Sequence, residues 1–184
     1  MAETILIDPE PFTADAWGEF GWVPVSDDDP TDGIHSLEFK WEDAHLNYII
    51  HTPDEVERTA DGFAVNRLYH HDTHTQALMP INCPALIAVA PPAVDFSTPG
   101  HARRVRAFLL DPLDCLVLHR GTWHYGPFPL GPEPVRLLNL QGRRYEDDSA
   151  YVDLDEATGV RVTVRVDAGV RGGAPDGEAR GQEA

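Results

Sequence analysis

Short segments in which apolar and polar residues alternate are the feature that most limits the fold of this chain. Val160–Val166 reads Val-Arg-Val-Thr-Val-Arg-Val, a period of two that is typical of a strand with one packed and one solvated face. Ala85–Ala90 is apolar throughout and ends at Pro91, which favours a central, buried strand. Further strands are predicted at Ile34–Trp41, Leu46–His51, Val105–Leu110, Cys115–His119 and Val135–Leu140.

Little helix is predicted between these strands. Many short strands separated by turns predict an all-β fold, either an antiparallel sandwich or a barrel. One short helix is expected near the N-terminus, because Asp8 can cap it and Pro9 suits its first position. This helix would carry Phe12 and Phe20 on one face and end near Gly18.

The chain has 184 residues, which fits one domain. We expect that domain over residues 1–168, followed by a disordered tail over 169–184 that is rich in Gly, Ala and charge. No apolar run approaches the length of a membrane span, and the first residues do not read as a signal peptide. The predicted location is the cytoplasm.

Acidic residues outnumber basic ones by 31 to 14, a net charge of −17. Such a field repels nucleic acids and anionic membranes, so neither is an expected partner. An anionic ligand would need a few arginines to form a positive pocket inside a negative molecule. The two cysteines, Cys83 and Cys115, lack the spacing of a metal or disulfide framework and are read as small buried hydrophobes.

Histidines gather in two clusters. His70, His71 and His74 form the first, and His119 and His124 form the second. Neutral imidazole binds metals and titrates near neutral pH, so two clusters on neighbouring strands suit a site in a barrel mouth. A strand histidine is as often a half-buried or exposed structural residue. A structural or surface role is preferred for His35, His45, His51 and His101, although His35 and His51 could also line the same interior because both lie in predicted strands.

Both clusters lie in segments that match known motifs. His119–His124 reads His-Arg-Gly-Thr-Trp-His, which is similar to the second cupin motif, Pro-x-Gly-x-x-His. His71 and Gln76 resemble the first cupin motif, with Gln76 where many cupins carry glutamate. Together with Thr75–Ile81 and Val105–Leu109, in the same order along the chain, these segments resemble the ureidoglycolate lyase family.

The resemblance implies a cupin-type antiparallel β-barrel, jelly-roll-like, with a short N-terminal helix. It implies an enzyme that splits ureidoglycolate into glyoxylate and urea in the breakdown of purines through allantoin, and a homodimer. The apolar faces of Ile34–Trp41 and Val160–Val166 are candidate interfaces, although each also suits a core.

Cleavage of this small anionic substrate needs a base for the hydroxyl proton, an acid for the leaving nitrogen and a cation for the carboxylate. His119 and His124 are the expected acid–base pair, with His71 as a further catalytic residue. The expected substrate-binding residues are Arg106, Arg120, Gln76, Trp123 and His74. An exposed arginine paired with nearby acids is nearly as good an interpretation of Arg106.

A metal site, if one exists, would consist of His71, Gln76 and His124, and the resemblance suggests nickel or zinc. Replacing glutamate by Gln76 removes a charge and weakens the binding of a divalent metal. Catalysis without a metal, or with a weakly bound metal, is therefore preferred, and no cofactor is firmly predicted.

The chain departs from the usual family pattern at His51, where an arginine is expected, and at Asn82. Two alternatives therefore stay open. One is a cupin that binds a small ligand without turnover, and the other is a cupin enzyme that acts on another small hydroxy acid.

Overall fold

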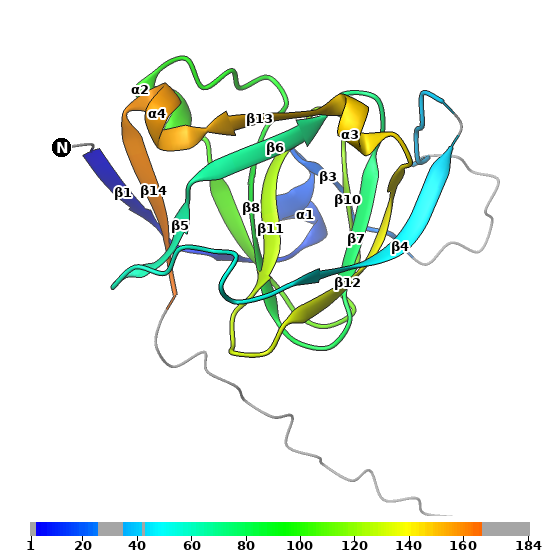
Figure 1. Ribbon diagram of the computed structural model, residues 1–184, viewed down its shortest axis with the longest axis horizontal. Helices are drawn as coiled ribbons and strands as arrows, with labels where there is room; N and C mark the ends of the chain where they lie inside the picture. Colours follow the sequence, from blue (N-terminus) through cyan, green and yellow to red (C-terminus); the bar gives the residue numbers. More distant parts are fainter. Residues whose placement is uncertain (1–2, 26–34, 42, 167–184) are drawn as a thin grey trace, which may run out of the picture.

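The computed structural model describes residues 3–25, 35–41 and 43–166, and strands dominate them (Figure 1). The described strands pair into three open sheets, so the all-β prediction is confirmed. The tail predicted over residues 169–184 lies outside the described residues. Within the described part of the chain, no helix is long and apolar enough to cross a membrane.

A five-stranded antiparallel sheet forms one wall of the molecule. Its β12 (Val135–Gly142) lies between β7 (Gln76–Pro80) and the edge strand β4 (Ala44–His51), and the opposite end carries β10 (Leu116–Leu118) and β3 (Gly21–Trp22). Gly21 is needed where β3 pairs with β10, because an added Cβ would collide with the backbone carbonyl of Val117.

A six-stranded sheet faces this wall. Its strands follow the spatial order β13 (Ser149–Asp153), β6 (Arg67–His71), β11 (Trp123–Pro129), β8 (Ala85–Ala90), β9 (Arg106–Leu110) and β2 (Glu10–Pro11). All pairs are antiparallel except β2 with β9, which is parallel.

A three-stranded sheet packs on the other side of the six-stranded sheet. It contains β1 (Glu3–Ile7), β14 (Val160–Arg165) and β5 (Gly62–Val65), with β1 parallel to β14. The helices are short: α1 (Ala14–Trp17), α2 (Pro99–Ala102), α3 (Tyr145–Asp148) and α4 (Leu154–Thr158).

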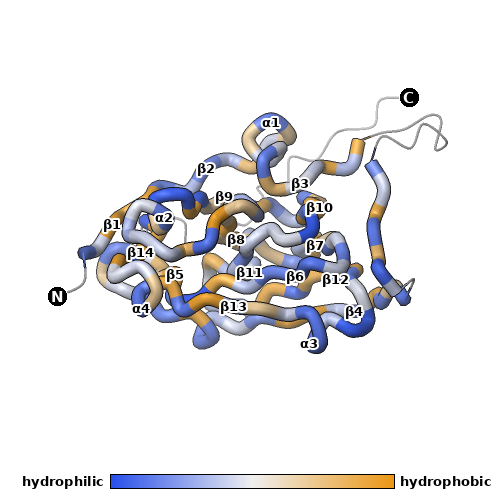
Figure 2. Tube along the Cα trace, turned by 90° about the horizontal axis from the view of Figure 1, so that it is seen from above, coloured by the Kyte–Doolittle hydropathy of each residue, from blue (hydrophilic) through white to orange (hydrophobic). Residues whose placement is uncertain are grey.

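The six-stranded sheet is buried on both faces. Ile87 of β8 packs in a core with Trp17, Phe108 and the five-stranded sheet, whereas its neighbour Leu86 packs in a second core with β5 and β14. This explains why β8 is apolar at every position, because neither of its faces meets water. Figure 2 shows the hydrophobic stretch along β9 inside the molecule and the hydrophilic α3 outside it.

Most strand predictions are confirmed, and one is wrong. Six predicted strands correspond within two residues at each end to β4, β8, β9, β10, β12 and β14; they are Leu46–His51, Ala85–Ala90, Val105–Leu110, Cys115–His119, Val135–Leu140 and Val160–Val166. Within Ile34–Trp41, however, the described residues 35–41 form only an isolated bridge between Phe39 and His74. Nearly all of these side chains are exposed, so no buried face holds the segment in a sheet.

The N-terminal helix exists, but it begins later than predicted. Thr13 caps α1, its side-chain oxygen accepting from the backbone N–H of Ala16, while Glu10 pairs with β9 instead. The helix ends at Gly18, as expected.

The apolar residues of β14, Val160, Val162 and Val164, are buried; this face is core, and it is not available as an interface.

Candidate functional site

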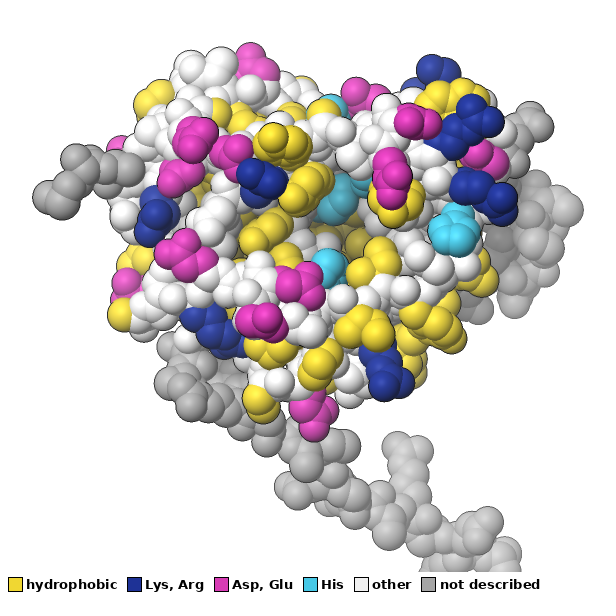
Figure 3. All heavy atoms as spheres, viewed as in Figure 1, with side chains coloured by type: hydrophobic (Ala, Val, Ile, Leu, Met, Phe, Trp, Pro, Cys, Tyr) yellow, Lys and Arg dark blue, Asp and Glu magenta, His cyan; other side chains and the backbone are white. Residues whose placement is uncertain are grey.

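A cavity of about 600 Å³ lies between the five-stranded and six-stranded sheets. Figure 3 shows it as a hollow with histidine side chains inside. Strands β4, β7 and β12 supply one wall, and β6, β11 and β13 supply the other. The residues lining the cavity include His51, Glu55, Asn66, Arg67, Tyr69, His71, Gln76, Leu78, His124, Tyr125, Phe128, Tyr145, Ser149 and Asp153.

Strand β6 presents alternate side chains to the cavity. Arg67, Tyr69 and His71 line it, whereas Leu68 belongs to the core on the other side. This is the period of two of a strand. On the neighbouring β11, His124 pairs with Tyr69 and also lines the cavity. Sequence positions 71 and 124 are thus brought together, with their ring centroids 5.4 Å apart.

The hydrogen bonds of His71 and His124 fix which ring nitrogen carries the proton. His124 Nδ1 lies 3.1 Å from the carbonyl oxygen of Thr122, which only accepts. His71 Nδ1 lies 3.2 Å from Ser149 Oγ, and that hydroxyl donates its own proton to the carbonyl oxygen of Tyr145 at 2.7 Å. His124 therefore carries its proton on Nδ1, and the contact of the Ser149 hydroxyl with Tyr145 favours the same tautomer of His71; in this form each ring presents Nε2 as a bare acceptor.

Burial keeps both imidazoles neutral. Desolvation, together with the neighbouring His124 and His74, lowers the pKa of His71 to about 3. Desolvation likewise lowers the pKa of His124 to about 4. Since the neutral form accepts a proton or a hydrogen bond, both side chains are bases at neutral pH.

Gln76 is held by a ladder of side-chain amides across β4, β12 and β7. Its Nε2 donates to Asn139 Oδ1 at 2.8 Å and to Gln141 Oε1 at 3.1 Å, and Asn139 Nδ2 donates to Asn47 Oδ1 at 2.7 Å. Gln76 Oε1 is buried and has no hydrogen-bond partner among the described residues. Both amide protons of Gln76 are therefore used within the protein.

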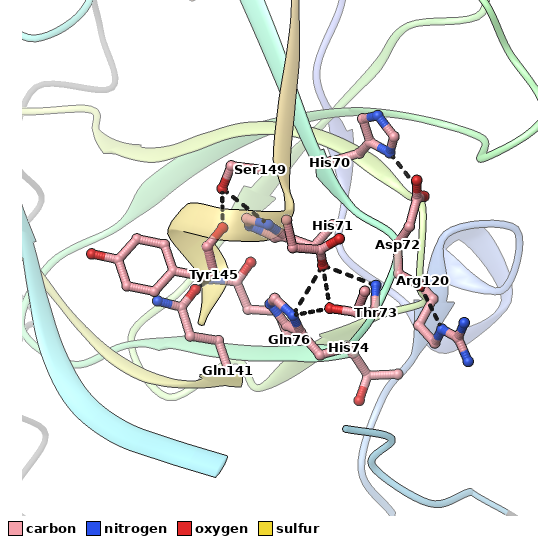
Figure 4. Close-up of polar contacts among 12 residues, drawn as sticks. His70, His71, Asp72, Thr73, His74, Gln76, Arg120, Gln141, Tyr145 and Ser149 are labelled. Carbon is pink, nitrogen blue, oxygen red and sulfur yellow. Dashed lines mark hydrogen bonds and ion pairs between the residues drawn. The ribbon is translucent and has the colours of Figure 1, made fainter. Parts of the chain in front are cut away.

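His74 lies behind His71 and does not line the cavity. The two rings stack with centroids 4.6 Å apart, and His74 Nδ1 is 3.4 Å from the carboxylate of Asp148. Asp148 in turn accepts from the backbone N–H and the hydroxyl of Thr73, and Figure 4 shows the contact between Thr73 and His74. The structure places His74 as a support for His71.

Arg67 is the single Lys or Arg among the described residues that line the cavity. Its Nε donates to Asp153 Oδ1 at 2.7 Å, and its guanidinium lies over the ring of Tyr151, 4.2 Å from the centroid. These contacts occupy one edge and one face of the guanidinium, and side-chain hydrogen bonds to Tyr69 and Asp153 raise the pKa of Arg67. A planar guanidinium of this kind can also bind a carboxylate.

The structure does not bring His119 and Arg120 to this cavity. They line a second, open hollow with His35, His70 and Asp72. Arg120 pairs with Glu38 at 3.1 Å and donates to the carbonyl oxygen of Asp72 at 2.8 Å. Glycine at position 121, with φ of 77°, turns the chain so that the two ends of the His119–His124 motif meet different hollows.

Arg106 and Trp123 also lie away from the cavity lining. Arg106 forms a two-pronged ion pair with Glu10, at 2.7 and 2.5 Å, as in the structural interpretation of this residue. Trp123 donates from its indole nitrogen to the carbonyl oxygen of Val94 at 2.8 Å and packs edge-on against Phe96 in the core.

The chemistry of the donor set does not fit a firm metal site. His71, His124 and Gln76 offer two imidazoles and an amide, with no carboxylate, and a neutral set of this kind holds a divalent metal weakly. No group of three His, Cys, Asp or Glu side chains in residues 3–25, 35–41 and 43–166 is arranged to hold a metal ion. We therefore derive no step through a metal.

Sequence reasoning missed Arg67, Tyr69 and Ser149. The first two carried a usable signal, because counting back in steps of two from His71 reaches both of them on the same strand face. Ser149 carried none, since only the pairing of β13 with β6 brings it to His71.

Comparisons with known proteins identify the family of the chain. A search of curated proteins gave no match. The family model described as ureidoglycolate lyase matches residues 31–163, more than two thirds of the chain, and this span contains the whole cavity lining. The chain therefore belongs to the ureidoglycolate lyase family, lyases that cleave ureidoglycolate in purine degradation.

Proposed function

We propose that His71 and His124 are the catalytic residues of a ureidoglycolate lyase and that Arg67 binds the substrate carboxylate. The observation that carries this proposal is the meeting of two neutral imidazoles, each with a bare Nε2, in one cavity with one arginine. His119 is left out because it lines the other hollow.

The reaction needs no net proton from solvent. One imidazole removes the proton of the substrate hydroxyl, the oxygen forms the C=O bond of glyoxylate, and the C–N bond breaks with its electron pair on nitrogen. The same proton, held on Nε2, then passes to that nitrogen and completes urea. One proton leaves the substrate and one returns, so a single well-placed base serves both steps.

The low pKa values of His71 and His124 belong to the empty cavity. A bound substrate adds a negative charge to the cavity, and this charge favours a protonated imidazole even though the carboxylate lies toward the Arg67 end. The substrate thus raises the basicity of the group that must take its proton. Arg67 holds the carboxylate at the exposed end of the cavity, where the anion stays paired.

We further propose that the two facing sheets form the cupin-type barrel that the resemblance implies. The cavity between them is the support for this, as it occupies the place of a barrel interior. A binding cupin without turnover has the same architecture, so only an assay separates the two.

The test is incubation of the purified protein with racemic ureidoglycolate. We expect urea and glyoxylate in equal amounts, faster than the spontaneous breakdown. Release of ammonia would indicate an amide hydrolase, and neither product above the spontaneous rate would indicate a binding protein.

We also propose a cytoplasmic homodimer that associates through the outer face of the five-stranded sheet. Leu46, Tyr48 and Ile50 of β4 are 63, 68 and 55% exposed. Leu138 and Leu140 of β12 stand beside Tyr48 and Leu46 in register. Single exposed apolar residues are ordinary, but a contiguous group on one sheet face is typical of an interface.

A further inference from the structure

We propose that Ser149 fixes the tautomer of His71, so that the buried end of the cavity presents only hydrogen-bond acceptors to the N–H groups of the substrate. The proposal rests on the function proposed above and extends it to substrate selection. It concerns the hydrogen-bonding character of the buried end rather than its shape.

The first step is that the buried end offers acceptors. His71 and His124 both have Nδ1 engaged with an acceptor, so each presents a bare Nε2. Gln76, Ser149 and Tyr145 also line this end. Both amide protons of Gln76 are taken by Asn139 and Gln141, and the hydroxyl protons of Ser149 and Tyr145 go to the carbonyl oxygen of Tyr145 and to Glu146. A ligand that reaches His71, His124 and Gln76 meets no free donor from them.

The second step is that the other end of the cavity offers a cation. Arg67 begins β6 and His71 ends it, so the guanidinium and the imidazole lie toward opposite ends of the cavity wall. An elongated ligand with a carboxylate at one end and N–H groups at the other matches this polarity. A ureido acid has that form, because its carboxylate is anionic and its terminal amide carries donors.

The third step is the role of Ser149, which lies on β13 next to α3 (Figure 4). Its hydroxyl has one proton, and that proton goes to the carbonyl oxygen of Tyr145 at 2.7 Å. The oxygen therefore faces His71 Nδ1 as an acceptor. Without the Ser149 oxygen, His71 Nδ1–H has no acceptor in this contact. The other tautomer of His71, which carries its proton on Nε2, would then present a donor to the substrate. Ser149 is a positioning residue.

A matched pair of ligands tests the proposal without turnover. N-carbamoylglycine and 4-oxopentanoate share one heavy-atom skeleton and one carboxylate, but the second carries CH₃ and CH₂ where the first has NH₂ and NH. Binding is measured by calorimetry on the full chain. A site built for hydrogen bonds rejects an analogue that lacks them, so we expect N-carbamoylglycine to bind at least about tenfold more tightly.

Three variants separate recognition from general weakening. Ser149→Ala should reduce the tenfold preference at least about threefold, and Ser149→Thr, which keeps the hydroxyl, should restore it. Arg67→Leu should weaken both ligands by a similar factor, because both carry the carboxylate, and leave their ratio unchanged.

A spectroscopic readout keeps the test independent of folding effects. Nitrogen-15 correlation spectra of the histidine rings should show a bare Nε2 on His71 in the unaltered chain and a shift toward the other tautomer in Ser149→Ala. Equal binding of the two ligands, or Nε2–H on His71 in the unaltered chain, would overturn the proposal. Discrimination without urea production would instead refute the lyase function and leave the recognition intact.

Discussion

Two histidines of one sequence motif, five residues apart, have different surroundings. His124 is buried in the cavity with its Nδ1 proton engaged, whereas His119 is exposed beside Trp22. Because the side chain that transfers the proton must contact the substrate, we expect His124→Ala to lower kcat about 10²–10⁴-fold. His119→Ala is the matched control and should change kcat only a few-fold. Steady-state assays, with circular dichroism to confirm folding, compare the two; equal losses would contradict the assignment.

The acid limb of the pH profile should report the lowered pKa values. The neutral imidazole is the active form, and the pKa values of His71 and His124 in the free enzyme are about 3 and about 4. We therefore expect kcat/KM to stay level from pH 7 to about 5 and to fall only as the pH approaches 4. A midpoint near 6.5 would show that an ordinary histidine controls the rate.

The lowered pKa values of His71 and His124 also make the stability of the folded state depend on pH. A histidine whose pKa is lowered by folding binds a proton more readily when unfolded, so the folded state loses stability as the pH falls below about 6.5. The pH assay therefore needs short exposures, with the folded fraction followed in parallel.

Among the strands, sequence patterns were reliable where at least one face of the strand is buried. The runs that became β8, β12 and β14 follow this rule. Residues 35–41 alternate equally well but bury almost nothing, so alternation without a partner surface misled the prediction. The site was half predicted: His71, Gln76 and His124 carry motif signals, whereas Arg67 and Ser149 depend on strand pairing across long stretches of sequence.

Strand β3 depends on a residue without a side chain. An added Cβ at Gly21 would overlap the carbonyl of Val117, and relief requires loss of the pairing between β3 and β10. We expect Gly21→Ala to destabilise the protein by about 2–4 kcal/mol, measured by urea unfolding. Gly131→Ala, where nothing lies within 4 Å of the added Cβ, should stay within about 0.5 kcal/mol. Similar values for the two would show that β3 shifts without cost.

For the whole molecule, the outer face of the five-stranded sheet lacks the charge that dominates elsewhere. The net charge is −17, yet the outward side chains of β4 and β12 from Leu46 to Ile50 and from Arg136 to Leu140 include no acid. A second copy can approach this face without bringing carboxylates of the two copies together.

The dimer prediction is tested with one charge. Tyr48→Glu places a carboxylate at the centre of this face and should convert a dimer into a monomer, as measured by light scattering. Leu113→Glu alters a side chain that is 66% exposed in a turn and should leave the dimer intact. A chain that is monomeric from the start, or a Tyr48→Glu variant that stays dimeric, would contradict this interface.

Arg67 is the single Lys or Arg among the described residues that line the cavity, in a molecule that is strongly acidic. At long range the net negative charge of the protein repels an approaching anion. Only within a few ångströms does the attraction of the Arg67 guanidinium exceed this repulsion. Added salt screens the first interaction over a Debye length of about 8 Å at physiological ionic strength, and it affects the close contact much less. The second-order rate constant for substrate binding should therefore increase with salt concentration, which is the reverse of electrostatic steering. An enzyme of this charge would bind its substrate fastest in a cell interior of high ionic strength.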